Sequence, residues 1–127
     1  MNVFATHGAF SWCELMTREP QAAMAFYGKL FGWTFETSAG GQGPYQVIKA
    51  QDAPVGGIMR TPPEAGAMPP MWGCYVTVDD VDATTAQCTA LGGSVVMPPT
   101  DIPSVGRFAV LKDPQGAVLT AITYQRR

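Results

Sequence analysis

The sequence has little of what metal centres, nucleic-acid binding and membrane insertion require. It contains one histidine, His7, so a site with several histidine ligands cannot form within the chain. Charged residues make up 14% of the chain, the net charge is −2, and no run of Lys or Arg occurs. Nucleic acids and anionic membranes attract clustered basic residues, so we expect neither as a partner. No segment has the roughly 20 consecutive apolar residues of a membrane-spanning helix.

Cysteine use indicates a reducing compartment. The chain has three cysteines, an odd number, and no Cys-x-x-Cys pair. Residues 1–10 also lack the basic start and the long apolar run of a signal peptide. We therefore predict a cytoplasmic protein in which Cys13, Cys74 and Cys88 act as small core residues.

What is present is typical of one globular domain. The chain has 127 residues, of which 46% are hydrophobic. The small share of charged residues leaves apolar surface that a second copy could cover, so we predict a homodimer.

The first half predicts a strand, a helix and three further strands. The helix begins at Pro20, whose missing N–H costs nothing there, and ends at Gly32, which can adopt a left-handed cap. The strands are expected at 10–16, 33–37, 45–50 and 55–59. The apolar stripe of this helix, expected to be buried, consists of Ala23, Phe26, Tyr27, Leu30 and Phe31.

A proline-rich linker at 61–71 separates this half from a second half with the same order of elements. Asp79, Asp80 and Asp82 stand where a helix begins, and we interpret them as capping residues. Strands are expected at 72–78, 94–97, 107–112 and 117–124, with a loop at 98–104. The expected buried stripe of the second helix consists of Val81, Thr84, Thr85, Cys88 and Leu91.

The two halves are spaced as an internal repeat. Trp72 follows Trp12 by 60 residues, and Gly92 follows Gly32 by the same interval. Neither copy is large enough to bury a sheet face well by itself. The prediction is a single α+β domain of two βαβββ modules, at about 10–60 and 72–124, whose cup-shaped mixed sheet carries the helices outside.

The motifs in these modules resemble a known family. Residues 25–33 read AFYGKLFGW, residues 76–83 read VTVDDVDA, and residues 113–116 read DPQG after Gly106-Arg107-Phe108. In order and spacing they resemble the vicinal oxygen chelate superfamily, which includes glyoxalases, bleomycin-resistance proteins and extradiol dioxygenases. The resemblance implies a site inside a cupped sheet, often with a divalent metal held by His or Gln, His and Glu on the first, fifth and last strands.

The positions that match those ligands carry other residues here. The resemblance places Trp12 at the first, Gly73 at the second and Thr120 at the third. We therefore predict that the protein holds no metal and no other cofactor. The repeat interval matches Trp72 to Trp12, whereas the helix motif matches Gly73, so which of the two faces the cup stays open.

Glu14 is the candidate catalytic residue. Strand alternation places it on the same face as Trp12, where a carboxylate must be paired, hydrogen-bonded or functional. It could act as a general acid or base. The structural alternative is an ion pair with Arg107 or Arg60.

Six residues are candidates for binding a substrate. Aromatic side chains could line an apolar pocket or simply fill the core. Arg107 could hold an anionic group or be a solvated arginine at a strand end. The set consists of Trp12, Tyr45, Trp72, Tyr75, Arg107 and Thr120.

These observations predict a glyoxalase-like protein that binds a small molecule, or a metal-independent enzyme, with an apolar pocket centred on Glu14. The alternative is a metal-dependent lyase, isomerase or dioxygenase of the same superfamily. A structural or sequestering role without chemistry is also open at this stage.

Overall fold

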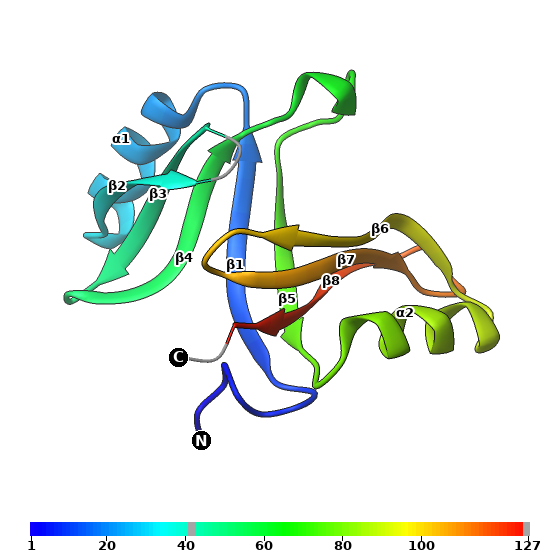
Figure 1. Ribbon diagram of the computed structural model, residues 1–127. Coiled ribbons are helices and arrows are strands. Elements are labelled where there is room, and N and C mark those ends of the chain that lie inside the picture. The colour runs from blue at the N-terminus through cyan, green and yellow to red at the C-terminus, as the bar shows by residue number, and fades with distance from the viewer. Residues whose placement is uncertain (41–42, 126–127) are drawn as a thin grey trace. The chain divides into compact units, whose positions relative to one another are not determined.

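The computed structural model describes residues 1–40 and 43–125, and its fold is α+β (Figure 1). Each half of the chain forms the predicted βαβββ module, which confirms the fold class. The contacts divide the chain into two compact units. We call residues 12–73 module one, and residues 1–11 with those from Cys74 onward module two.

In module one the strand order is β2-β3-β4-β1. The pair of β1 and β4 is parallel, whereas β3 pairs antiparallel with both β2 and β4. The elements are β1 (Phe10–Thr17), α1 (Pro20–Phe31), β2 (Thr34–Gly40), β3 (Gly43–Ala50) and β4 (Ala53–Arg60). A short turn of 3-10 helix, Pro63–Ala65, interrupts the predicted linker.

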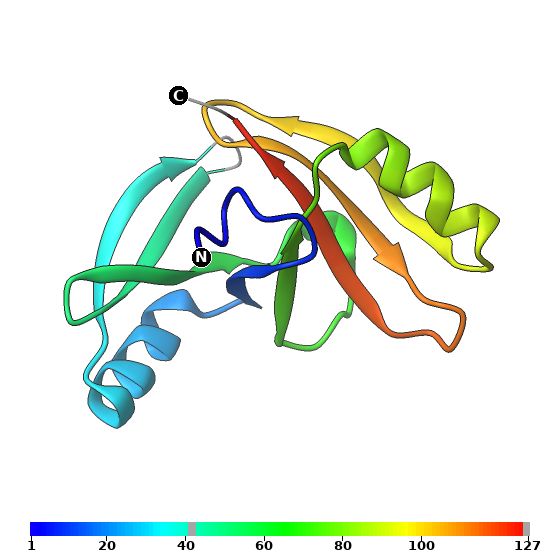
Figure 2. The same ribbon diagram turned by 90° about the horizontal axis from the view of Figure 1, so that it is seen from below.

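In module two the strand order is β5-β8-β7-β6, again with one parallel pair, β5 and β8. Figure 2 shows α2 running alongside the strands of this module, and it contacts β6, β7 and β8. The elements are β5 (Met71–Thr77), α2 (Val81–Ala90), β6 (Ser94–Ile102), β7 (Gly106–Lys112) and β8 (Val118–Tyr124).

Helix α1 begins and ends where the sequence predicts. Pro20 occupies its first turn, and Gly32 closes it with φ 73° while its N–H donates to the Gly28 carbonyl. The buried face of the helix is rotated from the predicted one. Ala23, Met24 and Tyr27 pack against a core of Leu15, Ile48 and Ile58.

Three members of the predicted stripe in α1 are therefore not buried. Phe26, Leu30 and Phe31 are 57–59% exposed. The prediction was wrong for them because it chose the widest run of apolar residues. In the fold, only the part of that run around Ala23 and Tyr27, together with Met24, meets the sheet.

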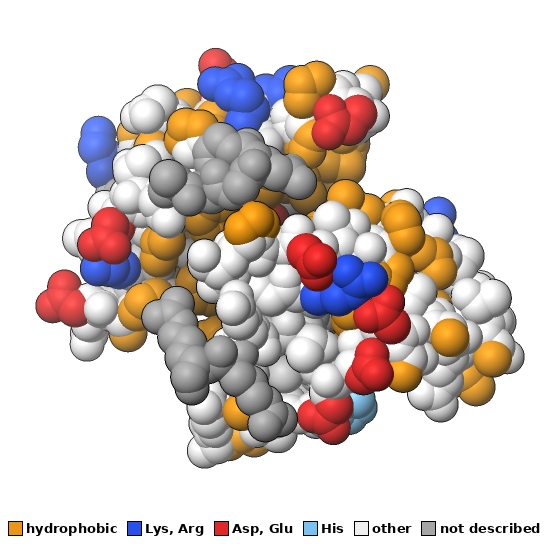
Figure 3. Space-filling view, in the orientation of Figure 1, with side chains coloured by type: hydrophobic (Ala, Val, Ile, Leu, Met, Phe, Trp, Pro, Cys, Tyr) orange, Lys and Arg blue, Asp and Glu red, His pale blue; other side chains and the backbone are white. Residues whose placement is uncertain are grey.

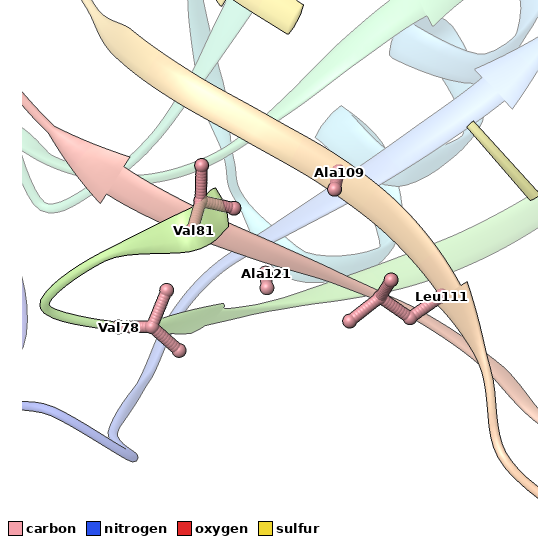
Figure 4. Packing of buried hydrophobic residues seen from close by; sticks show 5 residues of the cluster. All are labelled: Val78, Val81, Ala109, Leu111 and Ala121. Atoms are coloured by element: carbon pink, nitrogen blue, oxygen red, sulfur yellow. The ribbon is translucent and has the colours of Figure 1, made fainter. Parts of the chain in front are cut away.

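Of the three aspartates predicted to cap helix α2, Asp80 accepts the capping hydrogen bonds, whereas the side chain of Asp82 pairs with Arg107. One carboxylate oxygen of Asp80 accepts hydrogen bonds from the backbone N–H groups of Asp82 and Ala83, at 3.0 and 3.2 Å. Leu91 is an exception to the predicted stripe, because it lies past the last turn and is 72% exposed. The helix covers an aliphatic core, drawn in Figure 4, of Val78, Val81, Ala109, Leu111 and Ala121.

The cysteine prediction holds only for Cys88, which packs against that core. Cys13 and Cys74 are exposed. Cys13 lies two residues before Leu15 on the same strand face, and Leu15 belongs to the core of module one. Cys74 lies two residues before Val76 on the same strand face, and Val76 packs against the core of module two. The two buried clusters are small and end before reaching these thiols.

Strand β6 runs through the predicted loop at 98–104. It continues to Ile102 and pairs Asp101 with Arg107 of β7, with register shifts on both sides of Met97. Pro98 and Pro99 are tolerated because β6 ends the strand order of module two, where one side needs no ladder. Within the described residues, no helix is long and apolar enough to cross a membrane.

Candidate functional site

The sheet face of module one that points away from α1 carries the candidate site. Along β1, Leu15 turns toward the helix and joins the core, so Trp12 and Glu14 point the other way. Glu14 is 7% exposed, whereas Trp12 is half-buried. A carboxylate buried to this extent needs hydrogen-bond partners.

Tyr45 supplies such a partner and links Glu14 to Trp12. The indole Nε1–H of Trp12 donates to Tyr45 Oη at 2.8 Å, and Tyr45 Oη donates to Glu14 Oε2 at 2.8 Å. The structure thus brings together three of the predicted site residues, from β1 and β3. We call Trp12, Tyr45 and Glu14 the carboxylate network.

Gly57 makes this network possible, although it is not among the predicted site residues. Strand β4 lies between β1 and β3, and Gly57 pairs with Glu14 on one side and with Val47 on the other. A Cβ atom at position 57 would overlap the phenol of Tyr45. The ring of Tyr45 therefore reaches across β4 where that strand has no side chain. A glycine within a strand is a signal for such a close approach.

Arg60 and Arg107, the two cations predicted as possible partners of Glu14, each have other contacts. Arg60 donates to the backbone carbonyl of Arg18 at 2.8 Å. Arg107 is held within module two by two carboxylates, Asp82 at 2.8 Å and Asp101 at 3.0 Å. Figure 3 shows acidic and basic side chains side by side over β6 and β7.

The ion pairs of Arg107 shift the pKa values of Asp82 and of Arg107 itself. The hydrogen bond from Arg107 lowers the pKa of Asp82, and the bonds to Asp82 and then Asp101 raise the pKa of Arg107. The guanidinium is about one-third exposed and already compensated by two carboxylates. An anionic ligand would have to compete with both of them.

Trp72 lies with the helix rather than with the carboxylate network. Its Nε1–H donates to Tyr27 Oη at 3.2 Å, and its ring meets those of Tyr27 and Trp33 edge-on, with centroids 5.4 and 6.1 Å apart. The question left open by the sequence is thus answered within module one. Trp72 is on the α1 side, and Gly73 takes the opposite face.

Tyr75 and Thr120 are neighbours in module two. They are paired residues of the parallel strands β5 and β8, and both are half-buried. Further along β8, Tyr124 Oη shares a hydrogen bond of 2.8 Å with Ser11 Oγ. Burial raises the pKa of Tyr124, against a smaller opposite effect of that hydrogen bond.

Two cavities in module one lie away from the carboxylate network. One of about 230 Å³ is lined by residues 59–64, at the end of β4. The other, of about 420 Å³, opens beside α1 and includes Arg18, Glu19, Phe26, Tyr27 and Pro70 among its lining residues. Glu14 lines neither, so an apolar pocket around Glu14 stays a proposal.

With this fold and site described, the chain can be assigned to a family: it belongs to the Glyoxalase/Bleomycin resistance protein/Dioxygenase superfamily, whose model matches residues 9–120. It is 50% identical over 117 residues to the Mycobacterium tuberculosis protein named "Putative glyoxylase CFP32", covering 91% of this chain and 44% of that protein. It is 35% identical over 123 residues to the anthracycline biosynthesis protein DnrV of Streptomyces peucetius, covering 87% of this chain and 45% of DnrV. The chain therefore spans less than half the length of these relatives.

Solved structures share the fold. Methylmalonyl-CoA epimerase from Mycobacterium tuberculosis superposes with a TM-score of 0.67 at 12% identity, over 96% of this chain and 93% of the epimerase. A Mn(II)-bound glyoxalase from Novosphingobium aromaticivorans superposes with a TM-score of 0.59 at 20% identity, over 89% of this chain and 38% of the glyoxalase.

The residues at the family's metal positions do not fit a metal ion. The indole of Trp12 offers only an N–H donor, which is used on Tyr45, and Gly73 has no side chain. Thr120 offers a neutral hydroxyl in place of a carboxylate. Across residues 1–40 and 43–125, no three His, Cys, Asp or Glu side chains are grouped to hold a metal.

Proposed function

We propose that this protein binds a small organic molecule against the sheet face of module one that points away from α1, with Glu14 as the polar centre of the site. In a catalytic version of this role, Glu14 takes a proton from the bound molecule or returns one to it, without a metal. The observation that carries the proposal is a carboxylate only 7% exposed whose Oε2 accepts the hydroxyl proton of Tyr45.

Burial of a carboxylate lowers the stability of a protein, so a buried carboxylate indicates a structural or functional role. Its desolvation must be offset by hydrogen bonds, and an apolar residue of similar volume would often be at least as stable. Groups kept in such environments are frequent at functional sites. Trp12 and Tyr45 add flat aromatic surface beside the carboxylate, which suits a ligand with an apolar body. The relative DnrV is an anthracycline biosynthesis protein by name.

The test compares two carboxylate-to-amide changes in module one. Glu14→Gln keeps the shape of the side chain and removes its charge, whereas Glu36→Gln does the same at an exposed carboxylate paired with Lys49. Thermal melting of both variants and of the natural protein is measured with and without ligands from a small-molecule screen.

We expect Glu14→Gln to abolish the ligand-induced rise in melting temperature, with little effect in the absence of ligand. Glu36→Gln should leave both values unchanged. A stability loss on the order of 3–5 kcal/mol in Glu14→Gln with ligand binding intact would show that the carboxylate is structural.

The oligomeric state and the compartment are further proposals. Phe26, Leu30 and Phe31 present an exposed apolar strip on α1, and a second copy of the chain could cover it. We expect a homodimer in sedimentation at micromolar concentration, and only monomer there would contradict it. A cytoplasmic location stays a prediction that fractionation can test.

A further inference from the structure

The cavity of about 420 Å³ beside α1, which we call the α1 cavity, lies away from the carboxylate network and has its own combination of residues. In the first turn of the helix it is lined by the small side chains of Ala22 and Ala23. In the next turn it is lined by the rings of Phe26 and Tyr27. Residues three and four apart share one side of a helix, so the alanines leave a space that the two rings bound. The volume and the mostly apolar walls suit a small organic molecule.

The aromatic wall of the α1 cavity is held in place by its neighbours. Tyr27 Oη accepts a hydrogen bond from the indole N–H of Trp72 at 3.2 Å. The ring of Phe26 meets that of Tyr27 edge-on, with the centroids 5.0 Å apart. A wall that is already ordered reduces the entropy lost when a ligand binds.

Arg18 supplies the cavity with a positive charge. Its guanidinium donates to the backbone carbonyls of Gly66 and Met68. Carbonyl groups are neutral, so these bonds fix the position of the guanidinium without compensating its charge. Among the described residues no ion pair includes Arg18, whereas Arg107 is paired with two carboxylates. A guanidinium has five N–H donors, so Arg18 retains donors for a further partner.

Glu19 is the acidic residue that lines the same cavity. Its backbone N–H donates to Thr17 Oγ1 at 3.2 Å, and the residue is exposed. No hydrogen bond or ion pair fixes its carboxylate within residues 1–40 and 43–125. An exposed side chain that is not fixed can turn into solvent, where water and salt screen its charge. Arg18 is held at the cavity by two bonds, so the fixed charge there is positive.

We propose that the α1 cavity is a second binding site, which takes an organic anion with a flat apolar body, such as an aromatic carboxylate. The rings of Phe26 and Tyr27 contact the apolar body, and Arg18 donates charge-assisted hydrogen bonds to the anionic group. This inference does not depend on Glu14, which does not line the cavity. Of the residues that line it, only Phe26 belongs to the apolar strip that a second copy could cover.

The experiment uses three probes that share one ring system and are substituted at the same carbon: naphthoate, its methyl ester and naphthylmethylamine. The first is an anion, the second is neutral and the third is a cation. Affinities are measured by isothermal titration calorimetry at neutral pH for the natural protein, Arg18→Gln and the control Lys29→Gln. The control removes a positive charge from an exposed position of α1 that does not line the cavity.

We expect naphthoate to bind about tenfold more tightly than its methyl ester, the effect of one hydrogen bond between charged groups, with the amine weakest. Arg18→Gln should remove the advantage of naphthoate over the ester. Lys29→Gln should reproduce the natural ranking.

A second pair of variants tests the place of binding without changing a charge. Ala22→Leu fills the cavity from its own wall, whereas Ala25→Leu adds the same side chain at a position that does not line it. Both alanines are exposed on α1, so both variants should keep the stability of the natural protein. We expect Ala22→Leu to lower the affinity for naphthoate at least about tenfold and Ala25→Leu to leave it unchanged.

Naphthoate binding no more tightly than its ester, or binding equally well to Ala22→Leu, would overturn the inference. Affinity that is lost in Glu14→Gln and kept in Ala22→Leu would also overturn it, while supporting the site proposed around Glu14. If none of the three probes binds, the α1 cavity is not such a site, and the proposed function still stands on its own ligand screen.

Discussion

The two modules share one fold and differ in where they place their polar groups. Module two buries an aliphatic cluster that includes Val81 and Leu111, and its charged pair Arg107 and Asp82 lies exposed. Module one instead buries a carboxylate, Glu14, on the sheet face away from its helix. Its helix also leaves Phe31 and other apolar side chains exposed.

This difference separates the residues that mainly stabilise the fold from those proposed to bind a ligand. Among the described residues, the buried polar residues of module two, Ser11 and Thr77, are neutral, so this module gains its stability mainly from apolar burial. A module with a buried carboxylate carries a desolvation cost that only hydrogen bonds, or a ligand, can offset. Changes in module two should therefore alter the free energy of unfolding, and changes around Glu14 should also alter ligand binding.

The largest effect is expected from Leu111→Ala in the core of module two. Leu111 is 7% exposed, and its removal leaves a cavity against Val81 and Ala121. The free energy of unfolding should fall by about 2–5 kcal/mol in chemical denaturation. Affinities for ligands found in the small-molecule screen should stay at their natural values below the melting transition. A loss of ligand binding in this variant would break the division of roles between the modules.

Gly57→Ala should have a smaller effect on stability and a clear one on the carboxylate network. The added Cβ overlaps the phenol of Tyr45, so the ring must leave its place beside Glu14. We expect the free energy of unfolding to fall by about 1–3 kcal/mol, as for other overpacked sites, together with a changed affinity for ligands found in the small-molecule screen. The matched control is Gly28→Ala, whose Cβ would lie 3.5 Å from its nearest neighbours. It should be neutral or stabilising by up to about 1 kcal/mol, since alanine favours helix.

Tyr124→Phe tests how the stability of the protein falls at alkaline pH. Burial raises the pKa of Tyr124 in the folded state above its ordinary value of about 10. Because this pKa is higher in the folded state, the contribution of Tyr124 to the free energy of unfolding is complete below its ordinary pKa. That contribution is lost as the pH rises through the folded pKa. Melting temperatures followed above pH ~10 should fall less steeply in Tyr124→Phe than in the natural protein. Identical slopes would contradict the assignment.

The smallest effect is expected from Asp82→Asn at the edge of module two. Arg107 lowers the folded pKa of Asp82, so the ion pair contributes above the ordinary Asp value of about 4 and is lost as pH falls below it. Because the pair is exposed, the change in melting temperature should be near the limit of measurement and should vanish at high salt. A large, salt-independent loss would show that this edge is not the solvated surface described here.

Local signals in the sequence predicted much of this structure. Pro20, Gly32 and Asp80 mark helix ends because their effects act within one turn. Alternation along β1 is also a local signal, and it predicted that Glu14 and Trp12 share one face of the strand. The tyrosine that reaches Glu14 was harder to identify, because it depends on the register of β3, β4 and β1 together. One residue of register likewise decided that Trp72 joins Tyr27.

Gly57 also has a consequence for how this site can change through mutation. The space above this position is already occupied by the ring of Tyr45, so the two residues share one volume. A larger residue at position 57 becomes acceptable only when position 45 has become smaller, and neither single change keeps the network. Positions 45 and 57 should therefore show strong positive epistasis, with Tyr45→Ala rescuing the fold of a Gly57→Val variant. Libraries that vary the site one residue at a time would miss the alternative shapes that this pair permits.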